Sequence, residues 1–191
     1  MSLKVRADFP DSMRIEVLHA YIGDDEFTIG DDVRVKECSD AESIAKIISL
    51  YLDCLTGRIM VTIQWYFKPK DTKDSFIIKS CSSVELFSSD SVMDIEISSI
   101  DGKVNVLSFE QVVNMEENDD EDDIYFTRAK WNYKEGYLDP PMNLWKTDCI
   151  CNSIINPDIE FKHCSVCDRI LHVECLKKTG AMICPSCGED L

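Results

Sequence analysis

The sequence predicts a mainly β protein, in which a small β-barrel is followed by a compact module that metal ions hold together. Two observations lead to this prediction. Short segments rich in β-branched and aromatic residues, separated by turn residues, fill most of the first 140 positions. Seven of the ten cysteines and two of the three histidines then fall between Cys149 and Cys187.

The length and composition set the limits of the fold. The chain has 191 residues, a formal net charge of −16 and a hydrophobic share of 45%. This length fits one or two domains, and this composition excludes a wholly disordered chain. No apolar run approaches the ~18 residues of a membrane helix. The charged N-terminal residues, interrupted by Pro10, do not resemble a secretory signal, so we expect neither a membrane partner nor secretion.

The negative charge bears on the class of partner. Direct DNA binding needs clustered Lys and Arg, and this acidic chain argues against it. An acidic protein suits a basic partner such as a cationic peptide, although the alternative is that the acidity only keeps the protein soluble. Much of it lies in the run 116–123, where seven of eight residues are acidic. Like charges at this density repel one another, so a solvated loop is expected there.

The barrel strands are expected where apolar residues recur between turn signals. The clearest is 59–67, in which β-branched and aromatic residues alternate and which Pro69 ends. Asp101-Gly102 is typical of a tight hairpin turn, so one is expected at 100–103. The other expected strands are 27–29, 33–35, 44–51, 84–87, 95–97, 104–109 and 124–131. With a Pro-containing connection after them, the first domain is expected at 1–140, with its core at 22–136, and the second at 141–191.

The cysteine spacing predicts two metal sites. Without a secretory signal, a dense Cys/His cluster favours metal binding over disulfides. Zinc in structural sites takes four ligands in a tetrahedron, so eight ligands make two closed sites. About forty residues cannot bury a sufficient core unaided, whereas structural zinc contributes about 10–16 kcal/mol to small fingers. The expected ligands are Cys149, Cys151, Cys164, Cys167, His172, Cys175, Cys184 and Cys187. Cys38, Cys54 and Cys81 lie outside these spacings and are expected to be reduced strand residues.

The order of these ligands resembles the PHD finger, a zinc module of chromatin proteins. In that family alternate ligand pairs share a metal in a cross-brace. The resemblance therefore implies one zinc ion on Cys149, Cys151, His172 and Cys175, and a second on the other four cysteines. The same order occurs in RING-type ubiquitin ligases, which is an alternative. The eight residues between Cys175 and Cys184 are fewer than the groove of a ligase usually needs.

The strands of the first domain carry phrases that, as an ordered set, resemble a bromo-adjacent homology (BAH) domain. These phrases lie at 30–35, 44–47, 64–69, 85–90, 100–104 and 125–128. A BAH domain followed by a PHD finger is similar to the short plant and fungal BAH–PHD histone readers. That resemblance implies a nuclear, non-enzymatic chromatin reader that acts in transcriptional or silencing regulation and binds histone tails or other chromatin proteins. A scaffold subunit that does not bind histones is an alternative.

In those readers an aromatic cage on the BAH domain holds a methylated lysine through cation–π contacts. Trp65 and Phe67 match two walls of this cage, and strand alternation places both on one face. The third wall and a peptide-contacting His of the family are replaced here by Ser43 and Ser91. Two other side chains could substitute for the missing wall: Tyr51 and Tyr125.

The finger departs from the methyl-reading type as well. Ile170 stands where such fingers place a cage Trp, so the resemblance implies binding of the unmodified histone H3 tail, with a purely structural finger as the alternative. The tail would add as a strand to the segment 159–163. Acidic side chains would pair with its Lys or Arg, and backbone carbonyls would hold its amino group. The finger residues expected to bind the tail are Asp158, Glu160, Phe161 and Gly180.

Overall fold

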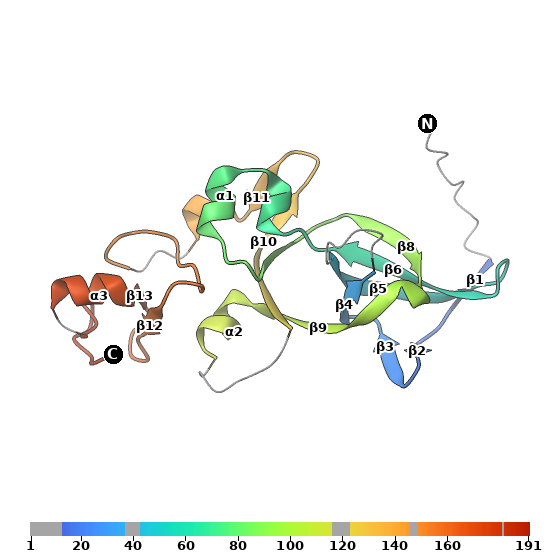
Figure 1. Cartoon of the computed structure of the whole chain (residues 1–191), viewed down its shortest axis with the longest axis horizontal. Helices are drawn as coiled ribbons and strands as arrows, with labels where there is room; N and C mark the ends of the chain where they lie inside the picture. The colour runs from blue at the N-terminus through green and yellow to red at the C-terminus, as the bar shows by residue number, and fades with distance from the viewer. Residues whose placement is uncertain (1–12, 37–42, 116–122, 146–148, 181) are drawn as a thin grey trace. The chain divides into compact units, whose positions relative to one another are not determined.

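The computed structural model describes residues 13–36, 43–115, 123–145, 149–180 and 182–191 (Figure 1). The N-terminal residues 1–12 and the acidic residues 116–122 lie outside these ranges, as does Cys38, so the expectations for them stay predictions. The described residues form thirteen β-strands and three short α-helices. The predicted mainly β class is therefore confirmed.

The chain divides into two compact units, and strand β9 (Ile100–Ser108) contributes residues to both. The first unit holds the described residues up to Trp65 together with 90–104, and the second holds 66–89 and everything described after 104. Residues of the expected barrel domain thus occur in both units. The expected boundary at residue 140 stays a prediction.

The first unit is built on an antiparallel sheet in which β9 pairs with β4, β4 with β5, β5 with β6, and β6 with β8. A short strand, β1, pairs with the far end of β5, and β2 and β3 form a hairpin. The strands are β1 (Arg14–Glu16), β2 (His19–Ile22), β3 (Asp25–Thr28), β4 (Asp32–Val35), β5 (Ser43–Asp53), β6 (Arg58–Trp65) and β8 (Val92–Glu96).

Alternation along these strands builds the first core. Val33 and Val35 on β4 are buried, and Val61 and Ile63 on β6 face the same cluster. The pairing register of β5 with β6 shifts by one residue between Ile47 and Ser49. Such a bulge turns the strand, which explains why the inward positions of β5 are Ala45, Ile47 and then Leu50. The remaining members of the cluster are Ala20, Phe27 and Ile100.

The tight turn expected at 100–103 is wrong. Gly102 lies inside β9, which runs without interruption to Ser108. Its φ of +148° is a conformation that L side chains rarely adopt. The pairing of β4 with β9 skips a residue here, with Arg34 opposite Gly102 and Val35 opposite Ile100. The glycine therefore makes a bulge in a continuous strand and not a hairpin turn.

The second unit contains a smaller sheet, two helices and the cysteine-rich residues. Strand β10 pairs in parallel with β7 and with the end of β9, and antiparallel with β11. Its elements are α1 (Ser75–Ser80), β7 (Glu85–Ser88), α2 (Phe109–Val113), β10 (Ile124–Asn132), β11 (Tyr137–Asp139), β12 (Phe161–His163), β13 (Ile170–His172) and α3 (Val173–Thr179).

Both helices that precede the cysteine-rich residues begin at a capping side chain. The carboxylate of Asp74 accepts from the backbone N–H groups of Phe76 and Ile77 at the start of α1. Ser108 and Gln111 form a reciprocal capping box at the start of α2. The cap at Ser108 explains why the strand expected over 104–109 ends at this residue.

The cysteine-rich residues share one hydrophobic core with the sheet and α2. Phe109 and Val113 from α2 and Phe126 from β10 lie in the same cluster as three buried ligand candidates: Cys149, Cys164 and Cys184. Its fully buried members from the cysteine-rich part are Ile155, Cys164, Ile170, Leu171, Leu176 and Cys184. A second cluster in this unit gathers Ile77, Phe87, Trp131, Leu138 and Trp145.

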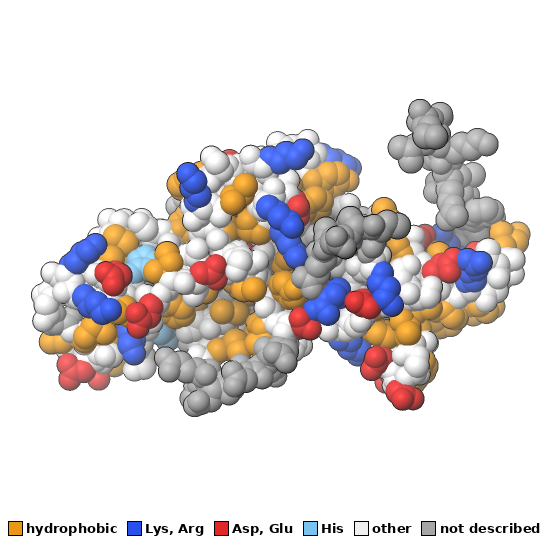
Figure 2. Space-filling view, in the orientation of Figure 1, with side chains coloured by type: hydrophobic (Ala, Val, Ile, Leu, Met, Phe, Trp, Pro, Cys, Tyr) orange, Lys and Arg blue, Asp and Glu red, His pale blue; other side chains and the backbone are white. Residues whose placement is uncertain are grey.

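Within the described residues, no helix is long and apolar enough to cross a membrane. Figure 2 shows Lys and Arg side chains interspersed with Asp and Glu over the visible face.

Candidate metal centres and binding surfaces

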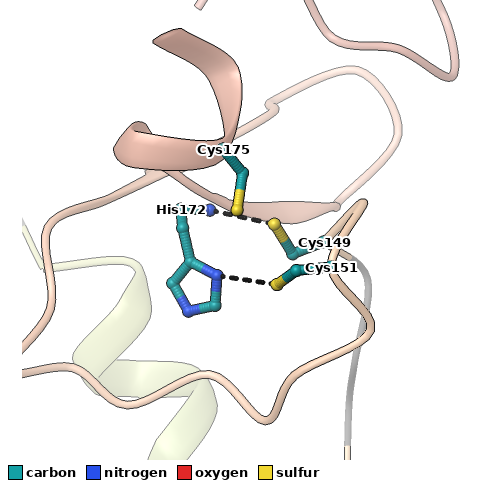
Figure 3. A group of neighbouring side chains, drawn as sticks. All are labelled: Cys149, Cys151, His172 and Cys175. Carbon is teal, nitrogen blue, oxygen red and sulfur yellow. Dashed lines mark hydrogen bonds between the residues drawn. The ribbon is translucent and has the colours of Figure 1, made fainter. Parts of the chain in front are cut away.

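The first metal centre gathers ligands from a loop, a strand end and a helix. Cys149 and Cys151 come from the loop, His172 ends β13, and Cys175 lies in α3 (Figure 3). Their four ligand atoms all lie within 4.8 Å of one another. Cys151 Sγ is 3.4 Å from His172 Nδ1, and the backbone N–H of His172 points at Cys149 Sγ at 3.4 Å.

The second centre is built by two matching turns. In each, the residue after a Cys-x-x-Cys pair has a positive φ and its N–H donates to the carbonyl of the first cysteine. Asp168 (φ 61°) donates to Cys164 at 2.8 Å, and Gly188 (φ 80°) donates to Cys184 at 2.9 Å. The two turns place four sulfur atoms within 4.8 Å of one another: those of Cys164, Cys167, Cys184 and Cys187.

Both groups fit zinc. Zinc bonds of about 2.1 Å to nitrogen and 2.3 Å to sulfur make a tetrahedron whose nitrogen–sulfur and sulfur–sulfur distances are about 3.6–3.8 Å. The contact of Cys151 with His172 is 3.4 Å, and those of Cys164 with Cys187 and of Cys167 with Cys184 are both 3.5 Å. Each group also supplies four soft ligands, so no coordination position is left open for catalysis.

Within the first metal centre, one thiol pKa is raised and another is lowered. Burial raises the pKa of Cys175 to about 11, and the adjacent Cys149 and Cys151 add to the rise. Burial also acts on Cys151, but hydrogen bonds from the backbone and side chain of Ser153 lower the pKa of Cys151 to about 6. Neighbouring thiolates repel one another, so only a bound cation stabilises all of them together. Metal binding must therefore displace protons.

The ligand sets match the pairing that the PHD resemblance implies, with alternate pairs sharing a site. His163, which the spacing left outside, lies outside both groups here as well. Its Nε2 atom contacts the Asp168 carboxylate at 3.1 Å. Ile170, at the position where methyl-reading fingers place a cage Trp, is buried in the shared core.

Asp158 lies in the loop between Cys151 and Cys164. Its two carboxylate oxygens accept from Ser82 Oγ at 2.5 Å and from the backbone N–H of Ser83 at 2.9 Å. The neighbouring Asn156 is buried and donates to the Cys81 carbonyl at 3.2 Å. The carboxylate that the sequence assigns to a tail contact is thus engaged within the chain.

Arg128 makes the most enclosed polar contacts of this region. It donates through Nε and Nη2 to the Glu85 carboxylate and through Nη1 to the Ile155 carbonyl at 2.8 Å. Its guanidinium carbon lies 4.3 Å from the ring centre of Trp145 and 4.5 Å from that of Phe109. An Arg on β10 therefore binds the backbone of the loop between the two metal-ligand pairs.

The two expected cage residues lie in different surroundings. Trp65 ends β6 and packs half-buried against the first core. Its backbone N–H donates to the Ser91 carbonyl at 2.9 Å. Phe67 belongs to the second unit, where its ring stacks on Tyr133 at 6.0 Å with an interplanar angle of 9°. Tyr133 is 43% exposed. Sequence reasoning missed this tyrosine, whose only signal was an aromatic residue beside a turn.

Cationic side chains lie over Tyr51 and Tyr125, the two residues that could replace the missing wall of the cage. The Arg14 guanidinium lies 4.4 Å from the ring centre of Tyr51, and the ammonium of Lys68 lies 5.9 Å from that of Tyr125. Both rings are more than nine-tenths buried. Ser43 begins β5 and is half-buried.

The strand expected over 159–163 is observed over Phe161–His163, as β12. Among the described residues, β12 pairs only with β13. Glu160, just before β12, is exposed and its carboxylate has no partner in the described part of the chain. Phe161 is half-buried in the shared core. Gly180 ends α3 in the left-handed conformation (φ 78°) and is exposed.

Comparison with known proteins points to one family. The model of the BAH domain family matches residues 25–142, more than half of the chain, and ends before the first metal ligand. Among solved structures, the chain is similar to the crystal structure of the yeast Rsc2 BAH domain. The TM-score is 0.52 and the identity 14%, over 65% of this chain and 53% of that one. At this identity the likeness shows the fold, and the chain spans about half of that structure. No curated protein matches the chain.

Proposed function

The chain belongs to the BAH domain family of chromatin-associated reader modules, and from this premise we propose that it is a non-enzymatic, nuclear chromatin reader that binds histone tails. The observation that carries the proposal is the family match over 25–142, joined to two four-ligand groups in the residues that follow. We propose that those residues form a PHD-type finger in which two Zn²⁺ ions are structural. A reader of this kind would act in transcriptional regulation or silencing.

The open side of β12 supports a site for the tail. A peptide that adds to this strand would satisfy its outward N–H and C=O groups by main-chain hydrogen bonds. Glu160, with its unpartnered carboxylate, is placed to attract a Lys or Arg side chain of the peptide. Gly180 is an exposed residue whose carbonyl would accept from a free amino group. Because Asp158 is engaged by Ser82 and Ser83, we assign the tail contact to Glu160 and a packing role to Asp158.

Methyl-lysine binding by the BAH domain would use Trp65 and Phe67. The stacked, partly exposed Tyr133 supports the Phe67 side of such a site, since a methyl-ammonium binds to exposed aromatic faces. We propose that this contact is weaker than in readers with a complete cage, because the positions of the family's third wall and His hold Ser43 and Ser91.

A modified histone-peptide array tests the proposal. The zinc-loaded chain is expected to bind H3 tail peptides. Trp65→Ala should remove only the preference for methylated lysine, and Glu160→Lys should weaken binding of every H3 peptide. Glu174→Lys is the matched control, since Glu174 is an exposed acidic residue on α3. Absence of binding to any histone peptide would contradict the reader and favour the histone-independent scaffold.

The ubiquitin-ligase alternative has its own assay. Discharge of ubiquitin from a charged conjugating enzyme, lost on replacement of a zinc ligand, would contradict a non-enzymatic role. We expect no discharge above the rate without the protein.

A further inference from the structure

A cavity of about 310 Å³ opens in the second unit, between α2, the segment after β11 and the cysteine-rich residues. Its apolar walls come from Phe109, Val113, Pro140, Leu144, Trp145 and Ile170. Leu144, at the edge of the cavity, is 69% exposed. The volume lies at the lower end of the range for ligand pockets, about 300–1,000 Å³, and suits one large side chain of a peptide.

The charges around this cavity favour a positively charged partner. Arg128 lines it, but its charge is already neutralised by the two-point contact with Glu85. Glu110, in the first turn of α2, is exposed and its carboxylate has no partner among the described residues. Asp168 contacts His163 and its side chain is 84% exposed. Of these groups, the Glu110 carboxylate is the one without a described partner, so the charge left over at the mouth is negative.

We propose that this cavity is a docking site for a basic peptide segment that carries one large apolar or aromatic side chain. The apolar side chain would enter between Leu144 and Ile170, and flanking Lys or Arg side chains would lie against Glu110 and Asp168. Complementary charge at the rim and an apolar centre are the arrangement that gives peptide interfaces both orientation and affinity. Glu160, Phe161 and Gly180, assigned above to tail binding, do not line this cavity, but His163 at the end of β12 does. The cavity therefore lies beside one end of the strand to which the tail would add. The inference rests on the proposed function only in the basic character of the partner.

The test uses the full zinc-loaded chain and a labelled synthetic peptide with Lys and Arg on both sides of a central Phe. Fluorescence anisotropy measures its affinity, beside a peptide with Ala for the Phe and another with Glu for every Lys and Arg. We expect binding of the first peptide, weakening by about ten-fold in the Ala peptide, and loss in the acidic one.

Two exposed positions test the cavity itself. Glu110→Lys and Leu144→Ser should each weaken binding about five-fold, the size expected for reversing one rim charge or truncating one rim apolar group. Glu174→Lys and Leu55→Ser are controls at exposed positions that do not line the cavity and should bind like the unmodified chain. Glu110→Gln keeps the shape at α2 and should give a smaller loss in the same direction.

Equal affinity for the Phe and Ala peptides, or unchanged affinity in both cavity variants, would overturn the inference. The histone-peptide array separates this result from the proposed function. Histone binding that survives in Glu110→Lys and Leu144→Ser overturns the cavity site as a histone contact and leaves the reader intact. Binding of the Phe peptide that depends on Glu110, without any histone binding, supports the cavity and contradicts the reader.

Discussion

Arg128 and Glu85 form a two-point ion pair in the interior of the second unit, with donor–acceptor distances of 2.7 and 2.8 Å. Their side chains are 8% and 0% exposed. Because the third contact of Arg128 is the Ile155 carbonyl, this pair joins β7 and β10 to the loop that carries the metal ligands. Removal of one partner leaves a buried charge without compensation.

The first prediction concerns this pair. Glu85→Gln and Arg128→Met should each lower the free energy of unfolding by about 3–5 kcal/mol, measured by urea denaturation of the zinc-loaded chain. The double variant Glu85→Leu with Arg128→Met should lose less than the sum of the singles, since it removes both charges. If each single variant lost less than about 1 kcal/mol of unfolding free energy, the pair would be exposed to water, contrary to its burial in the structure.

The second prediction concerns Asp158. Asp158→Ala removes the acceptor of Ser82 Oγ and of the Ser83 N–H, so it should destabilise the chain by about 1–3 kcal/mol. Hydrogen exchange should also speed up at 82–84, where the tethered backbone lies. Glu160→Ala is the control: it lies two residues away, its carboxylate has no partner among the described residues, and it should change neither quantity. A larger loss of stability in Glu160→Ala than in Asp158→Ala would mean that Asp158 acts at the surface.

The third prediction concerns metal removal. Zinc analysis should give two ions per chain, and Cys149→Ser should lower the value to one, while Cys54→Ser should keep two. Because the ligands share a core with Phe109 and Phe126, a chelator should loosen α2 and β10 as well as the finger. Hydrogen exchange of residues 105–113 and 124–132, with and without chelator, measures this coupling. Unchanged protection there would contradict the shared core.

The fourth prediction concerns the thiols that do not bind metal. Burial, with Glu85 next to it, raises the pKa of Cys81 to about 12. A raised thiol pKa keeps the sulfur protonated, so at pH 8 the reactive thiolate is about one part in ten thousand. In a zinc-loaded Cys38→Ser background, iodoacetamide should therefore modify the exposed Cys54 first and leave Cys81 unmodified. Mass spectrometry of the labelled peptides checks the order, and early labelling of Cys81 would contradict its burial.

Sequence reasoning reached the mainly β class and the BAH family because strand alternation and short ordered phrases are local signals. The eight predicted ligands lie in the two groups that the PHD resemblance implies, and their role as metal ligands stays a prediction. Sequence reasoning placed Cys54 and Cys81 in strands, but Cys54 lies in the turn after β5 and Cys81 follows α1. It also missed α1 and α2, whose helices are too short to show a periodic pattern.

The contacts that depend on distant residues were beyond the reach of the sequence. Asp158 and Glu160 are both acidic and two positions apart, yet only Asp158 meets Ser82, 76 positions earlier. Likewise Gly102 follows Asp101 as in a hairpin turn, but pairing with β4 draws the glycine into a bulged strand. In both cases the tertiary neighbours, which local pattern does not encode, decide the outcome.

The central claim is that histone tails are the partners of this chain. Its most direct test is the affinity of the zinc-loaded chain for reconstituted nucleosomes with intact tails, compared with nucleosomes from which the tails have been removed. A tail-dependent reader should bind the intact particle and lose at least about ten-fold in affinity without tails. Equal affinity for both particles, or no binding to either, would contradict the claim.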